Sequence, residues 1–321
     1  MTALPELPAA FEERLRVIVP PAHLAEALAS FTRPRPLTVR VNTLRADPGA
    51  VAAELTALGL TVLPLPWCPE ALHLPDGDRR VLTESAPVCD GRAYVQGQSS
   101  LLATLALDPR PGEENLDLAA APGGKTLHIA ARMADRGRLA AIEPIRGRFF
   151  RLKANIARAG ATIVALYQKD GRAVGGAVPD RFDRVLLDAP CSSEARFTRL
   201  DPASWAHWSP RKVAEAAKKQ RGLLASALTA LRPGGRLVYC TCSFAPEENE
   251  RVVSDALARR PEVDVVPWQA PIAPTQPGLV RWDGRELDPR LVRAVRVLPN
   301  AERDGFFVCV LTKAAASARD A

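Results

Sequence analysis

Two cysteines stand directly after short apolar runs, at positions where a thiol could act as a nucleophile. Cys191 follows RVLLDAP, and Cys242 follows RLVYCT. Each lies beside proline, serine or threonine at the expected end of a strand, a place where burial in an apolar core is unnatural. A thiolate there can add to an electrophilic carbon and divide a difficult reaction into easier steps. Since a free thiol has a pKa of about 8.5, a neighbouring positive charge would have to lower it.

The other four cysteines fit ordinary packing. Cys240 and Cys309 lie inside apolar runs, and we expect the same burial for Cys68 and Cys89. The chain has no Cys-x-x-Cys pair, and its four histidines do not cluster with the cysteines, so we expect no metal site.

A turn with two glycines, LDLAAAPGGKT, precedes a helical stretch and could bind a cofactor or a nucleotide. Gly123 and Gly124 allow the backbone to approach a ligand closely at a helix N-terminus. The final GKT matches the end of a phosphate-binding loop, but Ala119 stands where the first glycine belongs. A P-loop-like nucleotide hydrolase, with Asp188 as its magnesium-binding residue, is therefore one alternative.

Acidic residues at the ends of the next two strands favour a nucleoside-containing cofactor over a triphosphate. Glu143 ends the second strand, where an acidic residue can hold ribose hydroxyls. Asp170, after the third strand, is placed to accept an adenine amino group. A nucleotide hydrolase has no need of Glu143, so the pair argues against that alternative.

Such a cofactor beside a nucleophilic thiol suits methylation of cytosine at carbon 5. This carbon accepts a methyl group only after a thiolate has added to carbon 6, and a base then removes the carbon-5 proton as the thiolate leaves. Lys125 or the positive cofactor could lower the pKa of the thiol. Amine methylation needs no thiol and typically uses an Asn/Asp-Pro-Pro-aromatic loop, where this chain has DAPC.

Alternating strands and helices must position these residues. From Asn115 onward, apolar runs alternate with helical stretches, which predicts an α/β fold with a parallel sheet and helices on both faces. Ligands bind such sheets at the carboxyl ends of the strands, where the residues above lie. The expected strands are ENLDLAA, RLAAIE, TIVALYQ, FDRVLLDAP, GRLVYCTCS, VDVVPW and GFFVCVLTK.

The N-terminal third predicts a separate, smaller α+β domain. We expect this domain over residues 1–105, the larger domain over 106–313, and a disordered tail over 314–321. Arg33, Arg35, Arg40 and Arg45 are the favoured phosphate contacts of the small domain. Its expected elements are helices over 6–18, 21–31 and 48–59 and strands over 37–41 and 61–67.

The composition is compatible with a polyanionic partner. Lys and Arg number 43 against 36 Asp and Glu, a formal net charge of +7. No apolar run approaches the ~20 residues of a membrane span, and the N-terminus lacks a secretory signal. We therefore expect a cytoplasmic protein with no membrane partner, in which a Cys191–Cys242 disulfide is disfavoured.

At these motifs the sequence closely resembles the RNA cytosine-5 methyltransferases of the RsmB/RsmF/NSUN group, over nearly the whole chain. DLAAAPGGKT resembles the family's cofactor loop, DAPCSS its first cysteine motif and TCSFAPEENE its second. RVNTL, LPWCPE, AAIEP, AVPDRFD and DPASWAHWSP look most like the RsmF branch, which acts on small-subunit (16S) ribosomal RNA.

The resemblance implies a fold, a cofactor and a role for each site residue. The fold would be a Rossmann-like class I methyltransferase with a seven-stranded, mostly parallel sheet, preceded by an RRM-like RNA-binding domain. Cys242 would be the nucleophile, and Cys191 would assist release of the methylated product. Glu143 would hold the ribose, Asp170 the adenine and Asp188 the methionine end. The S-adenosylmethionine pocket would comprise Ala119, Ala120, Ala121, Pro122, Gly123, Gly124, Lys125, Glu143, Arg148, Asp170 and Asp188.

The same resemblance implies an RNA substrate. Lys125 and Asp188 would also touch the target cytosine. Ribosomal RNA is the first expectation and transfer RNA the alternative, with no obligate protein partner and a monomeric state. The family's Ser-Gly-x-Gly after the first cysteine is Ser192-Ser193-Glu194-Ala195 here, so a loop that favours positive φ is restricted. A catalytically weak RNA-binding relative therefore remains a further alternative.

Overall fold

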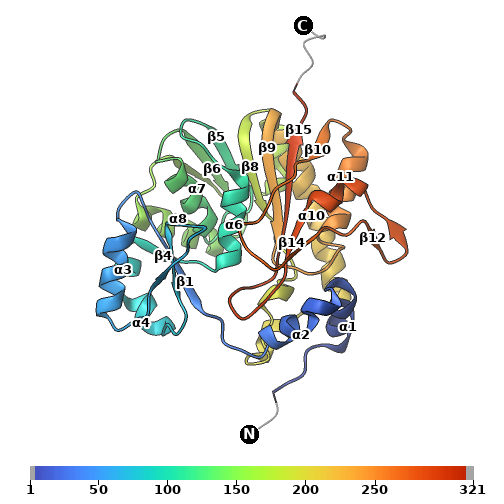
Figure 1. Ribbon diagram of the computed structural model, residues 1–321. Coiled ribbons are helices and arrows are strands. Elements are labelled where there is room, and N and C mark those ends of the chain that lie inside the picture. The colour runs from blue at the N-terminus through green and yellow to red at the C-terminus, as the bar shows by residue number, and fades with distance from the viewer. Residues whose placement is uncertain (1–3, 316–321) are drawn as a thin grey trace.

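The computed structural model describes residues 4–315, and its larger part is a nine-stranded sheet in the order β11-β14-β15-β9-β8-β5-β6-β7, with β10 paired to β15 (Figure 1). Five of these strands, β5 to β9, run parallel, and the rest pair antiparallel. The strands are β5 (Glu114–Asp117), β6 (Arg138–Ile142), β7 (Val164–Tyr167), β8 (Phe182–Asp188), β9 (Leu231–Thr241), β10 (Val263–Val265), β11 (Thr275–Pro277), β14 (Val295–Val297) and β15 (Phe306–Lys313).

The seven expected strands are all present, and the α/β prediction is confirmed. The sheet contains two further strands, β11 and β14, so the predicted number of seven was too low. Each has three residues, which is too short for an alternating pattern to show in the sequence.

Alternate residues of the central strands enter two separate cores. In β8, Val185 and Leu187 pack with helices on one face, whereas Leu186 packs with those on the other. This burial on both faces explains the continuous apolar runs. One face carries α6 (Gln98–Leu107), α7 (Gly124–Arg132) and α8 (Arg146–Ala159), and the other carries α9 (Val174–Ala177), α10 (Pro210–Ala230) and α11 (Glu250–Arg259).

The smaller domain contains a four-stranded antiparallel sheet in the order β2-β3-β1-β4. Val39 and Val41 of its central strand pack on Val51 and Leu55 of a helix, which confirms the α+β prediction. The elements are β1 (Leu37–Val41), α3 (Pro48–Ala57), β2 (Leu63–Pro64), β3 (Ala71–Leu74), α4 (Arg79–Glu84), α5 (Ala86–Cys89) and β4 (Ala93–Val95). Cys89 is exposed at the end of α5, so its predicted burial was wrong.

The first two helices lie apart from this small sheet, below the larger one in Figure 1. They are α1 (Ala9–Ile18) and α2 (Pro21–Ser30). Phe11 of α1 packs against Phe197, in the loop after β8, with ring centroids 4.9 Å apart. Phe31, after α2, packs edge-on against Phe244, in the loop after β9. The N-terminal helices therefore support the loops that follow the two cysteine-bearing strands.

The predicted domain boundary near residue 105 falls inside α6, whose buried residues join the core of the larger sheet. No helix within residues 4–315 is both long and apolar enough to cross a bilayer. Most of the tail predicted to be disordered lies outside the described residues.

The remaining elements are short. They are η1 (Gly171–Ala173), η2 (Glu194–Arg196), η3 (Pro202–Trp205), η4 (Pro289–Arg293) and the hairpin β12 (Arg281–Trp282) and β13 (Arg285–Glu286).

Candidate active site

A cavity of about 620 Å³ lies at the carboxyl ends of β5, β6, β8 and β9. Both candidate cysteines line it, together with every residue of the predicted cofactor pocket except Gly123. The cavity is therefore one continuous space for a cofactor and a reacting group. Its lining includes Ala119, Ala120, Ala121, Pro122, Gly124, Lys125, Glu143, Arg148, Asp170, Asp188, Cys191 and Cys242.

The two glycines have different roles in the loop after β5. Gly123 precedes α7 with φ at +111°, a conformation that L-residues rarely adopt. It forms the turn without lining the cavity. A Cβ on Gly124 would lie 2.9 Å from the Tyr94 ring. The first glycine permits the turn, and the second permits close packing of the small domain against it.

Asp117, at the end of β5, is a site residue that the sequence analysis did not assign. Its Oδ2 accepts a hydrogen bond from Thr126 Oγ1 at 2.7 Å, while Oδ1 is buried without a partner among residues 4–315. Burial raises the pKa of Asp117 to about 6. An acceptor left unpaired in the wall of the cavity suits a ligand that carries a donor or a positive charge.

The other acidic residues lie where the strand ends predicted. Glu143 is 1% exposed, and its Oε1 accepts the N–H of Ile145 at 2.9 Å. Arg148 donates to the carbonyl of Ala121 at 2.8 Å and so links α8 to the glycine turn. Asp170, at the rim, pairs with Arg172 at 2.6 Å, and this hydrogen bond lowers the pKa of Asp170.

The cysteines meet because β8 and β9 are adjacent parallel strands. Their Sγ atoms lie 3.4 Å apart, and both side chains are partly exposed. The hydrogen bond from Cys191 lowers the pKa of Cys242 to about 7, although burial acts in the opposite direction. The same contact, together with burial, raises the pKa of Cys191 well above its usual value. Either sulfur can donate in this contact; with Cys242 as the better thiolate at neutral pH, the Cys191 thiol is the donor of the pair.

Arg196 supplies a positive charge that acts on the Cys242 thiol. This residue also lines the cavity and lowers the pKa of Cys242. We expected Lys125 or the cofactor in this role. Lys125 instead forms a 2.6 Å ion pair with Asp188, and the net effect of burial and that carboxylate is a raised pKa for Lys125. Arg196 could have been found as a cation five residues beyond Cys191.

Two buried glutamates connect the loops that carry the cysteines; we call this arrangement the carboxylate clasp. Glu194, three residues after Cys191, accepts the N–H groups of Phe244 and Ala245, both at 2.9 Å. Glu248, six residues after Cys242, accepts the N–H of Ser192 at 2.9 Å and also its hydroxyl. Each loop thus supplies a carboxylate to the backbone of the other. The clasp sets the distance between the two sulfur atoms.

The loop after Cys191 needs a positive φ at only one of the two positions where the family has glycine. Ser193 adopts φ at +59°, as expected for the first position at which the family has glycine. Ala195 has no positive φ; its N–H donates to the carbonyl of Cys242 at 3.0 Å. The restriction that we predicted is therefore real at Ser193 alone.

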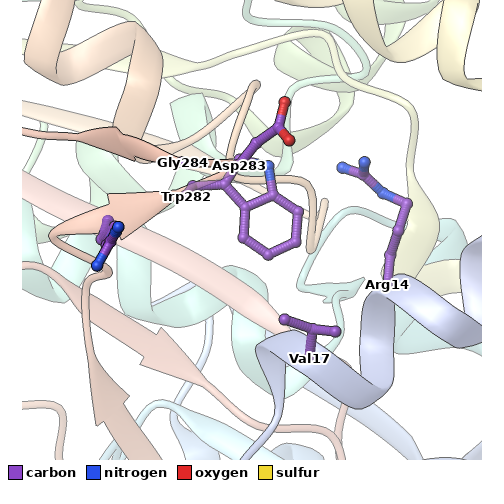
Figure 2. A pocket seen from close by; sticks show the side chains of 6 residues that line it. Arg14, Val17, Trp282, Asp283 and Gly284 are labelled. Atoms are coloured by element: carbon purple, nitrogen blue, oxygen red, sulfur yellow. The ribbon is translucent and has the colours of Figure 1, made fainter.

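Contacts outside the cavity hold the loop after Cys242. Glu247 accepts from Arg14 of α1 at 2.5 Å and from Trp282 Nε1 of the hairpin at 3.1 Å. Figure 2 shows Arg14 and Trp282 facing each other across a separate cavity of about 520 Å³. None of the predicted site residues lines this separate cavity, so Arg14 and Trp282 support the loop from outside the candidate active site.

Arg40 and Arg45, two of the expected phosphate contacts, bind other parts of the protein instead. Arg40 is 1% exposed and donates to Gln96 and to the carbonyl of Gly124 in the glycine turn. Arg45 donates to the carbonyls of Asp90 and Arg158. Burial lowers the pKa of Arg40 to about 10. Arg40 was therefore wrongly placed among the phosphate contacts, because β1 is the inner strand of a covered sheet.

One cluster joins a cysteine to a histidine, which the sequence did not suggest. Donor atoms of Cys68, Glu70 and His128 lie within 4.8 Å of one another. Glu70 already accepts from His128 at 2.9 Å and from Arg132 at 3.0 Å. Burial lowers the pKa of His128 to about 3, so the imidazole is neutral. These contacts connect the small domain to α7.

Comparison with known proteins agrees with this geometry. Residues 104–312 match the family model for the 16S rRNA methyltransferase RsmB/F, and residues 7–78 match the ferredoxin-like domain of RsmF/B-like methyltransferases. Ribosomal RNA small subunit methyltransferase F of Cronobacter sakazakii is 39% identical over 316 residues, which cover 96% of this chain and 64% of that protein. The chain spans about half to two thirds of the length of such relatives.

Solved structures show the same architecture. The methyltransferase homolog protein from Pyrococcus horikoshii is 30% identical, with a TM-score of 0.77, and the match covers 96% of this chain and all of that one. NSun6 from the same organism, solved with SFG, shares the fold at 23% identity and a TM-score of 0.80, covering 95% of this chain and 98% of that one. The predicted class I methyltransferase fold is confirmed. Because the first model covers well over half of the sequence, the chain belongs to the RsmB/RsmF methyltransferase family.

Proposed function

We propose that the chain methylates carbon 5 of a cytosine in RNA, with S-adenosylmethionine as the methyl donor. The observation that carries this proposal is the hydrogen-bonded pair of sulfur atoms, 3.4 Å apart, in one cavity with the glycine turn. A class I methyltransferase acting on an amine or hydroxyl has no use for two thiols there.

The lining residues fit the proposed cofactor. Asp188 would hold the methionine end of the cofactor, where the orphaned Oδ1 of Asp117 offers a further acceptor. Residues 119–122, with Gly124 and Lys125, would form the wall, and Arg148 would brace it through Ala121. Glu143 would hold the ribose and Asp170 the adenine. When bound, S-adenosylmethionine supplies an electrophilic methyl group.

The protein's own part in the reaction is covalent. The Cys242 thiolate adds to carbon 6 of cytosine, so that the electron pair of the 5,6 double bond makes carbon 5 nucleophilic. Lys125 and Asp188, paired at 2.6 Å, would hold the polar edge of the base. After methylation, a base takes the carbon-5 proton, the double bond re-forms and the bond from Sγ to carbon 6 breaks. The Cys191 thiol, 3.4 Å from Cys242 Sγ, would assist this release by donating to the departing thiolate.

The substrate we propose is 16S ribosomal RNA, with transfer RNA as the alternative. The support is the name of the relatives, ribosomal RNA small subunit methyltransferase F. We further propose that residues 1–105 bind the RNA, that residues 106–313 carry the chemistry, and that the protein acts as a monomer. Position-specific bisulfite sequencing of RNA from cells with and without the gene identifies the cytosine.

Methyl transfer from labelled S-adenosylmethionine to total RNA tests the proposal. The wild-type protein should label RNA, and Cys242→Ala should abolish the label. An unchanged rate in this variant would refute the nucleophile. Isothermal titration that found tight binding of ATP with magnesium, and none of S-adenosylmethionine, would favour a nucleotide hydrolase instead. A relative that only binds RNA would bind it without labelling it.

A further inference from the structure

A second cavity, of about 420 Å³, adjoins the catalytic cavity behind the loop of Cys191. Pro190, Cys191 and Lys219 line both spaces. These three residues form the wall that the two cavities share, so the cavities are direct neighbours.

One side of this second cavity is a rigid aromatic wall. Trp208 is partly exposed, and its Nε1 donates to Glu194 of the clasp at 2.9 Å. Its ring packs edge-on against Phe197, which also lines the cavity, with ring centroids 6.3 Å apart. His207 adds an exposed imidazole beside the tryptophan. Flat rings held in place can support a nucleobase of any sequence.

The lining of this cavity also carries positive charge. Lys212 and Lys219 lie two turns apart on α10, and both line the cavity. Glu215, the only acidic residue of the lining, is already paired with Lys212 at 2.8 Å and with Arg211 at 3.1 Å. No carboxylate within residues 4–315 forms an ion pair with Lys219. Asp170, whose pKa is lowered by its hydrogen bonds with Arg172 and also by Lys219, is already paired with Arg172, so the ammonium group of Lys219 lies available at the junction of the two cavities.

We propose that this second cavity binds the nucleotide next to the target cytosine, with its phosphate on Lys219 and its base on the surface of His207 and Trp208. The inference rests on the proposed function, since a base bonded to Cys242 has left its stack and its strand must continue past the cavity wall. The phosphate is attracted by charge and the base by stacking, so the contact has no strong sequence preference.

A matched pair of lysines tests the inference. Lys218 is exposed on α10 beside Lys219 but lines neither cavity. The probe is a fluorescein-labelled, single-stranded RNA of five uridines, one cytosine and five uridines, and binding is followed by anisotropy at several salt concentrations. Lys219→Ala should weaken binding about fivefold and reduce the slope of log K against log salt by about 0.7. Lys218→Ala should stay within about twofold of the wild type.

A second arm tests the aromatic wall. Removing the base beside the cytosine, so that an abasic nucleotide remains, should weaken binding to the wild type and have less effect in His207→Ala. Equal losses in both proteins, or a Lys219→Ala variant that behaves like Lys218→Ala, would overturn the assignment. So would failure of the wild-type protein to bind this RNA.

Cofactor binding separates the two proposals. His207→Ala, a change at a residue that lines only the second cavity, should bind S-adenosylmethionine as the wild type does, measured by isothermal titration. Parallel loss of cofactor and RNA binding in this variant would assign His207 to the cofactor and overturn the subsite. A wild-type protein that neither binds S-adenosylmethionine nor labels RNA refutes the proposed function itself. Normal methylation with equal effects of both lysine variants refutes only the subsite.

Discussion

The Sγ atoms of Cys191 and Cys242 lie 3.4 Å apart, within hydrogen-bonding distance, and the surroundings of the two thiols differ. The contact between them lowers the pKa of Cys242 and raises that of Cys191. Arg196 adds to the first effect and Glu248 to the second, so the nucleophile is distinguished by the charges around it.

Cys191→Ala should leave a protein–RNA adduct that survives a denaturing gel. The variant keeps the Cys242 thiolate that forms the bond to carbon 6 but lacks the thiol that assists its release. Incubation with RNA and S-adenosylmethionine, followed by gel electrophoresis, measures the adduct. Cys242→Ala is the control and should give none. An adduct from that control, with none from Cys191→Ala, would reverse the two roles.

Alkylation of Cys242 should show an inflection near pH 7, since its pKa is about 7. The thiolate fraction, and with it the rate, falls as the pH drops below this value. Arg196→Gln removes a positive charge, so the pKa should rise and the rate at pH 7 should fall several-fold. Mass spectrometry of the Cys242 peptide after iodoacetamide treatment follows both. Arg211→Gln, on the exposed face of α10, should leave the profile unchanged; an inflection near pH 9 in the wild type would contradict the assignment.

Glu194→Ala should destabilise the protein by about 3 kcal/mol, because the buried N–H of Phe244 loses its acceptor and that of Ala245 keeps only its 3.1 Å contact with Ser243 Oγ. The change also frees Trp208, so methyl transfer should fall with it. Urea unfolding measures the first effect. Glu194→Gln keeps one oxygen acceptor, so its free energy of unfolding should fall less. Glu215→Ala, on the surface, should leave the free energy of unfolding almost unchanged. Equal stability of Glu194→Ala and Glu215→Ala would show that the clasp does not hold the loops.

Ser193→Gly should increase the free energy of unfolding by about 1 kcal/mol. The φ of +59° at this position strains a residue with a Cβ and suits glycine. Thermal or urea unfolding gives the change directly. Ser192→Gly is the comparison: it removes a hydroxyl that donates to Glu248 and should destabilise the protein. A loss of stability in Ser193→Gly would mean that its backbone strain is small.

Much of the site could be predicted from the sequence because it depends on local pattern. The residues of β8 alternate between two cores, so a strand of this kind is apolar throughout. The continuous apolar runs in the sequence therefore identified the strands of the sheet and the points where they end. Parallel strands present those ends at a single edge. Cys191, Cys242 and the turn before α7 therefore had to share a crevice, whatever their exact contacts.

The tertiary structure decided everything that depends on partners distant in the chain. Arg40 was expected at the surface, but the covering of its sheet buried it and directed it to Gly124. Arg196, and not Lys125, acts on Cys242, because Asp188 already pairs with the lysine. Glu194 and Glu248 hold loops separated by about fifty residues. Charge and hydrogen bonding act across a few ångströms of space, and only the folded chain sets those distances.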